Sequence, residues 1–420
     1  MARTVAGLPE GTRLTDYISL GVVTRAFPLP TVRRILEETD RASQRERELP
    51  AHVMVYYVIA LALYMQVSYR EVLRCLLEGM RWLAEPDATF RPAGASAISQ
   101  ARSRLGVTPV QRLYEEVVGP IATPETPGAW YRGRRLVSLD GTTFDVGDTR
   151  ANEKAFGRPG SSRGVNATGA FPQLRLLGLV ETGTHVVFGA AIGRYSDSEA
   201  TLTRSVLPAL RPDMLCLADR GFMGFDLWRE ALATRAALLW RAKGNMKFPV
   251  DERFADGSYR STMRWNYFCR STERTPIPVR VIEYELPGVS DAEPVYRIVT
   301  SLLDPEQAPA AELAAFYHER WEIETAFDEL KTHLRGARVA LRSKTPELVR
   351  QEAYGFLLAH YAVRDLMHQA ALAVTPRARD PDTLSFVHAV RVIRRTLPRV
   401  AALPPSGPGA GPAGHPGGTP

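Results

Sequence analysis

The spacing of apolar residues changes once along this chain, and this change limits the possible folds more than any other feature of the sequence. Before the proline-rich stretch Thr123–Gly128, apolar residues recur every three to four positions, which is the period of amphipathic helices. After it, Arg135 to Phe144 alternates as a half-buried strand does. With 420 residues, the chain is long enough for two to three domains of about 150 residues each. We therefore expect a helical N-terminal region, a linker, and a second region built around a sheet.

The order of elements after the linker predicts a mixed sheet. The pattern gives three strands, then a helix, a strand, a helix, a strand, a β-rich stretch, another strand and a long helix. They fall at 135–144, 174–181, 185–192, 198–210, 214–219, 225–234, 237–241, 259–285, 296–303 and 310–333. Three consecutive strands form a meander, and the later helices must cover both faces of the sheet. The fold class is α/β, or α+β overall.

The charge of the chain is basic and unevenly distributed. The net charge is +7, and residues 335–400 alone carry 12 basic residues against five acidic ones. Residues 1–130 are nearly balanced, with 15 arginines and 14 acidic residues. Such an excess favours an anionic partner, nucleic acid ahead of a membrane, without identifying it.

Composition also excludes several classes of protein. Cys75, Cys216 and Cys269 lie far apart, which excludes a disulfide framework and a cysteine-rich zinc site. We find neither the pattern of a signal peptide nor an apolar run long enough to cross a bilayer. The expectation is a cytoplasmic protein with no membrane partner.

Two aspartates follow apolar strands. Asp140 lies at the end of a strand and precedes Gly141, and Asp219 ends the strand at 214–219. A carboxylate at the carboxyl end of a strand points into the crevice where open sheets bind ligands. The alternative for either residue alone is an aspartate that opens a turn.

A third group of polar residues lies on the helix predicted at 310–333. At about 100° per residue, Tyr317, Arg320, Glu324 and Lys331 fall within an arc of roughly 60°. The alternative is a solvated face with internal ion pairs, because other acidic residues flank the stripe. The helix alone does not decide between them.

Taken together, the three groups suit phosphodiester chemistry. Two divalent ions about 4 Å apart activate water and stabilise the leaving oxygen. Mg²⁺ prefers oxygen ligands, and carboxylates from three separate elements are enough to hold it. Arg320 and Lys331 would then hold DNA phosphates, with Tyr317 beside them.

These residues resemble the insertion-element-four (IS-four) family of bacterial DDE transposases, which have an RNase H-like core. The resemblance rests on Leu139–Thr142, on Ala218–Phe222, and on the Y-x2-R-x3-E-x6-K spacing on the last helix. Leu49–His52 and Ser96–Arg102 are similar to the N-terminal domain of the group. The resemblance covers residues 15–370.

The resemblance implies an RNase H-like mixed sheet, flanked by helices and interrupted by a β-rich insertion, in which Asp140, Asp219 and Glu324 are catalytic and hold Mg²⁺ or Mn²⁺. Tyr317, Arg320 and Lys331 would contact DNA. The activity implied is that of a transposase that binds terminal inverted repeats, cleaves DNA and transfers strands by cut-and-paste through hairpin ends. The implied partners are double-stranded transposon ends and target DNA, with a homodimer in the synaptic complex, associated with the bacterial nucleoid when acting.

The expected domains follow from these patterns. They are a helical DNA-binding or accessory domain at 1–125, the catalytic core at 130–243 and 296–370, the β-rich insertion at 244–295, a basic helical region at 371–403, and a disordered Pro/Gly-rich tail at 404–420.

Two further assignments leave alternatives open. The helix Ser96–Leu105 either reads DNA, with Arg102 and Arg104 as contacts, or is a bundle helix with one solvated face. Trp265 in the insertion either packs in the core or stacks on an extruded base.

Other functions remain as alternatives. A catalytically inactive or domesticated transposase would bind DNA without cutting it, although the intact carboxylates argue against this. A metal phosphatase acting on small molecules is disfavoured by the Arg/Lys stripe and the helical N-terminal region.

Overall fold

A computed structural model describes residues 20–44, 49–84, 93–159, 171–265, 274–285, 295–319, 322–336, 340–373 and 379–395. The helices before the linker are α1 (Leu20–Ala26), α2 (Leu29–Glu38), α3 (Ala51–Leu63), α4 (Tyr69–Ala84), α5 (Ala95–Leu105) and α6 (Thr108–Val117). The predicted helical N-terminal region is therefore present.

Every strand of the described chain joins one sheet. The strands are β1 (Trp130–Tyr131), β2 (Arg134–Asp145), β3 (Gln173–Glu181), β4 (Val187–Arg194), β5 (Met214–Ala218), β6 (Ala237–Arg241), β7 (Glu252–Arg253), β8 (Tyr259–Met263), β9 (Ile277–Tyr284) and β10 (Tyr296–Thr300). Their spatial order is β4-β3-β2-β5-β6-β10-β9-β8-β7, with β1 beside β2. The pairs β2–β5 and β5–β6 are parallel and the others antiparallel, so the predicted mixed sheet and its opening meander are confirmed.

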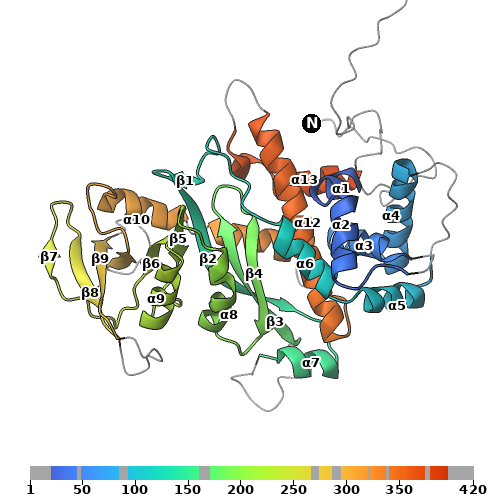
Figure 1. The fold of residues 1–420 in the computed structure, drawn as a ribbon, viewed down its shortest axis with the longest axis horizontal. Helices are drawn as coiled ribbons and strands as arrows, with labels where there is room; N and C mark the ends of the chain where they lie inside the picture. The colour runs from blue at the N-terminus through green and yellow to red at the C-terminus, as the bar shows by residue number, and fades with distance from the viewer. Residues whose placement is uncertain are drawn as a thin grey trace, which may run out of the picture.

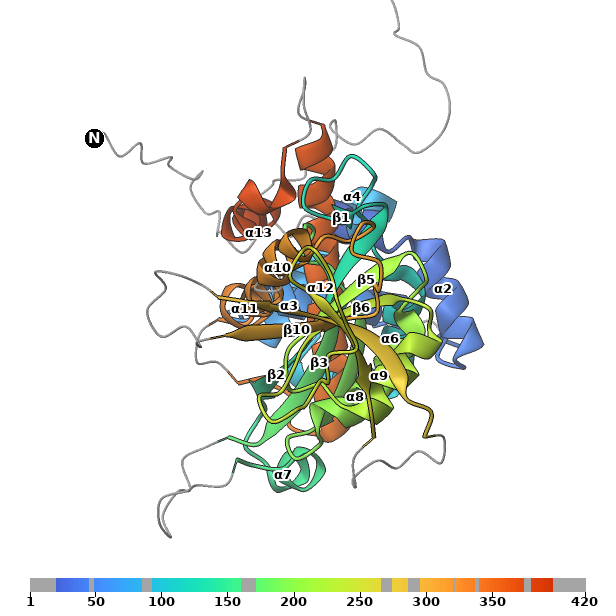
Figure 2. The same ribbon diagram turned by 90° about the vertical axis from the view of Figure 1, so that its left-hand side faces the viewer.

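Helices cover both faces of this sheet. Between the strands lie α7 (Arg150–Phe156), α8 (Glu199–Val206), the short 3₁₀ turn η1 (Leu207–Ala209) and α9 (Phe225–Ala233). After the last strand come α10 (Ala310–Glu319) and α11 (Glu322–Asp328). Figure 2 shows α10 and α11 on one side of the strands and α8 and α9 on the other.

Strand β5 shows why both faces need cover. Leu215 and Leu217 belong to the apolar cluster under α10, whereas Cys216 packs with the larger cluster on the opposite face. Because a central parallel strand is buried on both faces, its sequence is a continuous apolar run and not an alternating one. The residue that follows this run is Asp219, at the point where the strand leaves the core.

The β-rich segment extends the main sheet instead of forming a separate one. Strands β7, β8 and β9 are antiparallel neighbours, and β9 pairs with β10, which in turn pairs with β6. The prediction of an antiparallel β region is thus confirmed, and its strands lie at one end of the molecule (Figure 1).

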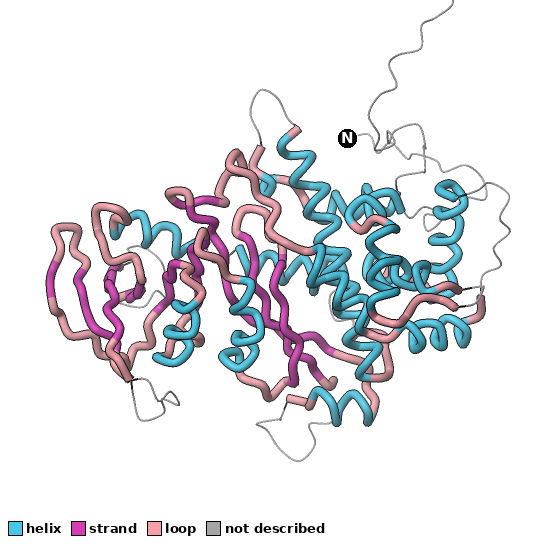
Figure 3. The backbone as a smooth tube through the Cα atoms, in the orientation of Figure 1, coloured by secondary structure: helices cyan, strands magenta, loops and turns pink. Residues whose placement is uncertain are grey.

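The long helix α12 (Pro346–Leu372) lies between the sheet and the N-terminal helices (Figures 1 and 3). Helix α3 crosses it at Gly355, where an added Cβ atom would lie 2.7 Å from the carbonyl oxygen of Val58. Only glycine permits this approach. The C-terminal segment continues as η3 (Pro381–Thr383) and α13 (Phe386–Arg395). The N-terminal helices and the region built around the sheet therefore share one apolar core.

Among the described helices, none is both long and apolar enough to cross a bilayer. The tail predicted to be disordered at 404–420 lies outside the described residues.

Candidate active site

The structure places Asp140 and Asp219 side by side. In the parallel pairing of β2 with β5, Leu139 is opposite Ala218, and the two aspartates are the next residue along each strand. Neighbouring strands lie about 4.8 Å apart, and residues in register on them point to the same face. Both aspartates are half-buried. Two carboxylates thus project from one face of the sheet at the same level.

The sequence suggested that Asp140 ends its strand, but in the structure it does not. Strand β2 continues to Asp145 because it stays paired with β3, while its pairing with β5 stops at Leu139. Asp140 therefore lies where the parallel ladder opens, which leaves its side chain beside the end of β5 and not inside a continuous sheet.

Short backbone contacts orient the two carboxylates. The amide of Gly141 donates to Asp140 Oδ1 at 2.7 Å, and the amide of Gly221 donates to Asp219 Oδ1 at 2.6 Å. Each aspartate is followed within two residues by a glycine whose N–H reaches back to it. One oxygen of each carboxylate is held in this way.

Tyr317 connects helix α10 to the end of strand β5, next to Asp219. Its ring is buried, and its hydroxyl donates to the carbonyl oxygen of Ala218 at 3.4 Å. Ala218 immediately precedes Asp219, so the end of α10 lies against the strand that carries the second aspartate.

Helix α11 crosses the face that carries Asp140. In the antiparallel pairing of β2 with β3, Gly178 is directly opposite Asp140, so both residues point to the same face. A Cβ atom added to Gly178 would lie 3.1 Å from the ring of Phe327. Phe327 comes one helical turn after Glu324, which is exposed. The third predicted carboxylate is therefore carried by a helix that packs beside the first.

The helix predicted at 310–333 does not stay α-helical to its end. Helices α10 (Ala310–Glu319) and α11 (Glu322–Asp328) are described within it, and Glu329–Leu334 is a π-helix (η2) that contains Lys331. Because a π-helix closes its turns over one more residue than an α-helix, Lys331 is not stacked over Glu324 as the 60° arc assumed. Arg320 lies outside the described residues.

Glu199 is the residue that the sequence did not single out. An added Cβ atom at Gly141 would lie 2.6 Å from Glu199 Oε1, and one at Gly221 would lie 3.6 Å from Glu199 Oε2. Arg175 Nη1 donates to Glu199 Oε1 at 3.2 Å. The helix start was visible in the sequence, because Ser198 caps α8 through Thr201, but nothing there pointed to the two aspartates. Only the tertiary fold brings this carboxylate to the two glycines.

Arg102 corrects the expectation of a DNA contact in the N-terminal region. Its side chain is buried, and its guanidinium donates to Gln351 Oε1 at 2.9 Å, Ser343 Oγ at 3.0 Å and the carbonyl of Leu348 at 3.2 Å. These bonds fasten α5 to α12, so Arg102 is not available to a phosphate. Arg104, two residues on, is exposed.

The donor set fits Mg²⁺ in its chemistry. Aspartate oxygens are hard ligands, and Mg²⁺ is commonly held by one or two carboxylates while it keeps several waters. Within the residues that the structure describes, no group of three or more His, Cys, Asp and Glu side chains is placed to hold a metal ion. Asp140 and Asp219 thus supply the oxygen type that Mg²⁺ prefers, while Glu324 is carried by the neighbouring helix.

Comparison with known families identifies the class of protein as an enzyme that cleaves and transfers DNA strands. Residues 131–361 match the transposase DDE domain, and residues 17–115 match the N-terminal domain of insertion element 4 transposases. The first match covers more than half of the chain. The chain therefore belongs to the transposase DDE domain family, in its insertion element 4 group, as the motifs predicted.

Individual relatives agree with this assignment. The transposase InsG for insertion sequence element IS4 of Escherichia coli (strain K12) is 27% identical over 392 residues, which is 92% of this chain and 83% of that protein. The putative transposase InsZ of the same strain is 25% identical over 201 residues, or 48% of this chain and 64% of that protein. A cryo-EM structure of the piggyBac transposase synaptic complex with hairpin DNA aligns over 95% of this chain and 88% of that one, with a TM-score of 0.44 and 11% identity. That structural likeness is too distant to support an argument.

Proposed function

We propose that this DDE transposase cuts DNA at the terminal inverted repeats of its element, with Asp140, Asp219 and Glu324 as the catalytic carboxylates. The observation that supports the proposal is that Asp140 and Asp219 lie on the same face of the sheet. Asp140 and Asp219 follow paired residues of adjacent parallel strands, and Phe327 of the Glu324 helix packs on the residue opposite Asp140. Three acidic residues from separate parts of the chain are thus carried by elements that pack against one another.

The proposed ligand of these carboxylates is Mg²⁺, for which Mn²⁺ can substitute. When bound, the metal supplies activation of water and charge stabilisation at the phosphate. The chain's own contribution is to orient the two aspartates through the Gly141 and Gly221 amides and to fix their spacing by strand pairing.

DNA contacts are proposed at Arg320 and Lys331 near the carboxylates and at Arg104 in the N-terminal region, whereas Tyr317, expected beside them, is assigned a supporting role. Tyr317 is buried, so its role is to hold the helix end against β5, while Lys331 is half-buried and faces partly to solvent. We assign DNA binding to the helical region 1–125 and catalysis to 130–243 and 296–370. A homodimer on DNA follows from the need to hold two ends together.

A pocket supports the finer proposal that cleavage passes through hairpin ends. It has a volume of about 1020 Å³, and its lining includes Gly221, which lies two residues after Asp219. Lys243, Lys247 and Trp265 contribute to its lining. The Trp265 side chain is 37% exposed and meets Phe225 edge-on, with ring centroids 6.3 Å apart. It is not buried in the core, and a partly exposed indole beside basic residues suits stacking on an unpaired base.

The first test measures cleavage and binding in parallel. Asp140→Asn, Asp219→Asn and Glu324→Gln should each abolish Mg²⁺-dependent nicking of a duplex carrying the terminal repeats, while binding of that duplex persists. Asp148→Asn is the control, because Asp148 is an exposed acid eight residues from Asp140 that pairs with Arg158. Normal nicking by Glu324→Gln would refute the assignment. Binding without cleavage by the unaltered protein would instead favour an inactive, DNA-binding descendant.

The second test separates hairpin formation from nicking. Trp265→Ala should leave the first nick nearly unchanged and lower the yield of hairpin ends about tenfold, since base stacking on an aromatic ring is worth about 1–3 kcal/mol. Phe171→Ala, another exposed aromatic, serves as the control. Equal hairpin yields from both variants would remove Trp265 from the proposal.

A further inference from the structure

The π-helix η2 lies between two residues of the proposed site. It begins at Glu329, five residues after Glu324, and contains Lys331. π-turns are rare and are frequent at functional sites, because they turn the following residues relative to a regular helix. The direction of Lys331 relative to Glu324 therefore depends on what stabilises this turn.

Glu329, the first residue of the π-helix, is buried, and several donors surround its carboxylate. Its Oε2 accepts from His360 Nε2 at 2.9 Å and from Arg364 Nε at 2.9 Å, and its Oε1 accepts from Arg364 Nη2. His185 Nδ1 lies 3.4 Å from Oε1. Only 3% of the residue is exposed. A buried carboxylate with this many charged and polar donors holds its helix in one orientation.

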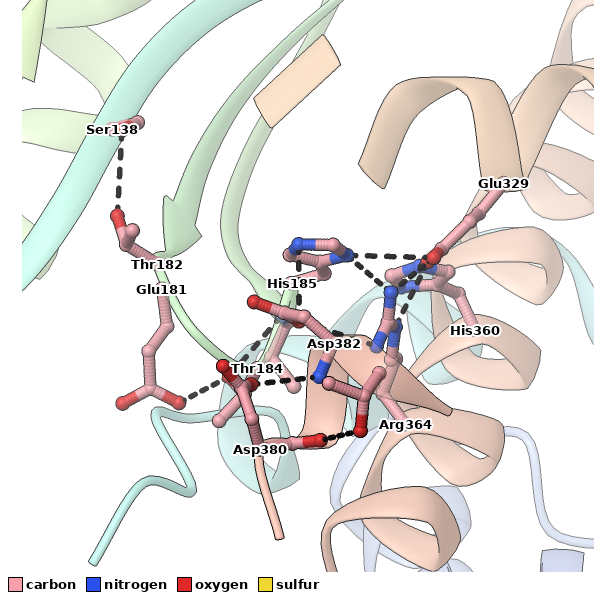
Figure 4. Close-up of polar contacts among 12 residues, drawn as sticks. Ser138, Glu181, Thr182, Thr184, His185, Glu329, His360, Arg364, Asp380 and Asp382 are labelled. Carbon is pink, nitrogen blue, oxygen red and sulfur yellow. Dashed lines mark hydrogen bonds and ion pairs between the residues drawn. The ribbon is translucent and has the colours of Figure 1, made fainter. Parts of the chain in front are cut away.

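The donors come from parts of the chain that are far from η2 in the sequence. His360 and Arg364 lie one turn apart on α12, and His185 lies in the turn between β3 and β4, as Figure 4 shows. His185 Nε2 is also 3.2 Å from Asp382 Oδ1 in the C-terminal segment. The cluster thus joins η2, the turn between β3 and β4, α12 and the C-terminal segment.

The ionisation of the cluster agrees with its geometry. Burial would raise the pKa of Glu329, but the hydrogen bonds from His185 and His360 and the charge of Arg364 lower it well below the ordinary value. The carboxylate therefore remains ionised and keeps its bonds to Arg364 throughout the ordinary pH range.

The segment that carries Glu324 is held on two sides. On the sheet side, Phe327 packs on Gly178 opposite Asp140. On the other side, Glu329 is bound to α12, which is itself locked against α3 at Gly355. Phe327 fixes how close the helix lies to the sheet, and Glu329 fixes its rotation about its own axis.

We propose that Glu329 is a positioning residue for strand cleavage: through Arg364 and His360 it sets the rotation of α11 and η2, and so directs Glu324 and Lys331 toward the site. The inference rests on the proposed role of Glu324. It differs from a purely structural role, in which the loss of Glu329 would lower stability alone.

The test compares two buried carboxylates. Glu352 is buried to the same degree as Glu329. It accepts hydrogen bonds from the backbone amides of Arg342 and Ser343, which lie outside α11 and η2. Glu329→Gln and Glu352→Gln are assayed in the full chain at a temperature where both are folded. The readouts are the nicking rate at saturating DNA and the affinity for Mn²⁺ alone, measured by electron paramagnetic resonance.

Glu329→Gln should slow nicking by about 10- to 100-fold and weaken Mn²⁺ binding by a similar factor, as expected when a supporting contact of a metal ligand is lost. Glu352→Gln should change neither quantity. If Glu329→Gln retains the rate and the Mn²⁺ affinity, or if both variants lose them equally, the inference is overturned.

Two further variants complete the design. If Glu329→Gln does not fold, Arg364→Lys keeps the positive charge but removes the Nε donor, and should show the same two losses in weaker form; unchanged values would overturn the inference. Glu324→Gln is measured alongside. Retained nicking in Glu324→Gln refutes the proposed function itself, whereas its loss together with a normal Glu329→Gln refutes only the positioning role.

Discussion

The fold contains carboxylates of two kinds, and the contrast between them separates structure from chemistry. The first kind is fully buried and receives several hydrogen bonds; it comprises Glu181, Glu329 and Glu352. The second kind is half-buried or exposed and lies at the candidate site; it comprises Asp140, Asp219 and Glu324. Both kinds are acidic, yet the chain treats them differently.

Each buried carboxylate joins segments that are far apart in the sequence. Glu181 at the end of β3 accepts the amides of Ile121 and Ala122 in the linker, at 2.9 and 3.0 Å. Burial of an ionised group is tolerated only when donors replace water, so these residues and their donors form a structural unit. Asp140 and Asp219 at the opening of the sheet are only half-buried, so water solvates part of each carboxylate and no such set of donors is required.

The largest expected effect comes from breaking the buried set. Arg364→Met removes the main charged donor from Glu329 and leaves a buried carboxylate undercompensated. We expect the free energy of unfolding to fall by about 3–5 kcal/mol, which is typical when one partner of a buried ion pair is lost. Chemical denaturation followed by circular dichroism measures it.

An exposed pair provides the matched control. Arg132 and Glu312 form an ion pair with side chains 46% and 41% exposed. Arg132→Met should cost less than about 1 kcal/mol, because solvent already screens such a pair. A loss for Arg364→Met no larger than that of the control would mean that the buried cluster does not stabilise the fold.

The second prediction concerns the close approach of Glu199 to Gly141, the residue after Asp140. In Gly141→Ala, the new Cβ atom would lie 2.6 Å from Glu199 Oε1, so the Glu199 side chain or the β2 backbone must move. We expect nicking to slow by about 10- to 100-fold with DNA binding intact, since small displacements at a reacting centre have effects of that size.

Gly244→Ala is the comparison for this variant, because an added Cβ atom there meets nothing within 4 Å. Nicking rates are measured for both proteins under the same conditions. A normal rate for Gly141→Ala would show that the close packing of Glu199 on Gly141 has no part in catalysis.

The sequence was most informative where function depends on local pattern. The strand around Asp140, the strand before Asp219 and the change of period at the linker were all readable, because alternation and apolar runs are local. The π-turn that begins at Glu329 was not, since it is stabilised by His360 and Arg364, which lie more than thirty residues downstream. The predicted DNA contact at Arg102 was wrong for the same reason. Its hydrogen-bond partners include Gln351 on α12, and the periodicity of a helix carries no information about such distant partners.

The third prediction is a loss of stability in mild acid. Burial lowers the pKa of His360 below its ordinary value, although Glu329 acts in the opposite direction. In the unfolded chain this imidazole takes up a proton below about pH 6.5, whereas in the folded protein it resists protonation. The unfolded state therefore binds more protons as the pH falls, and stability decreases from about pH 6.5 downward.

Thermal unfolding between pH 7.5 and 5 measures this effect, with His360→Gln as the reference. Glutamine can still donate to Glu329 but does not titrate, so its curve should fall less steeply. Among the groups that face His360, Glu329 stays ionised in this range because its pKa is lowered, and Asp382, whose pKa burial raises, contributes in the opposite sense. Parallel curves for the two proteins would exclude His360 as a source of the acid sensitivity.

The smallest expected effect completes the contrast. Asp140→Asn should change the free energy of unfolding by no more than about 0.5 kcal/mol, the usual range away from buried networks. The amide oxygen can still accept from Gly141, and removal of one charge relieves repulsion from Asp219, about one strand spacing away. The difference should appear only with metal: Mg²⁺ raises the melting temperature of the unaltered protein, because a ligand bound to the folded state stabilises it, and has no such effect on Asp140→Asn. A variant as unstable as Arg364→Met, or one stabilised by Mg²⁺ like the unaltered protein, would place Asp140 among the structural carboxylates instead.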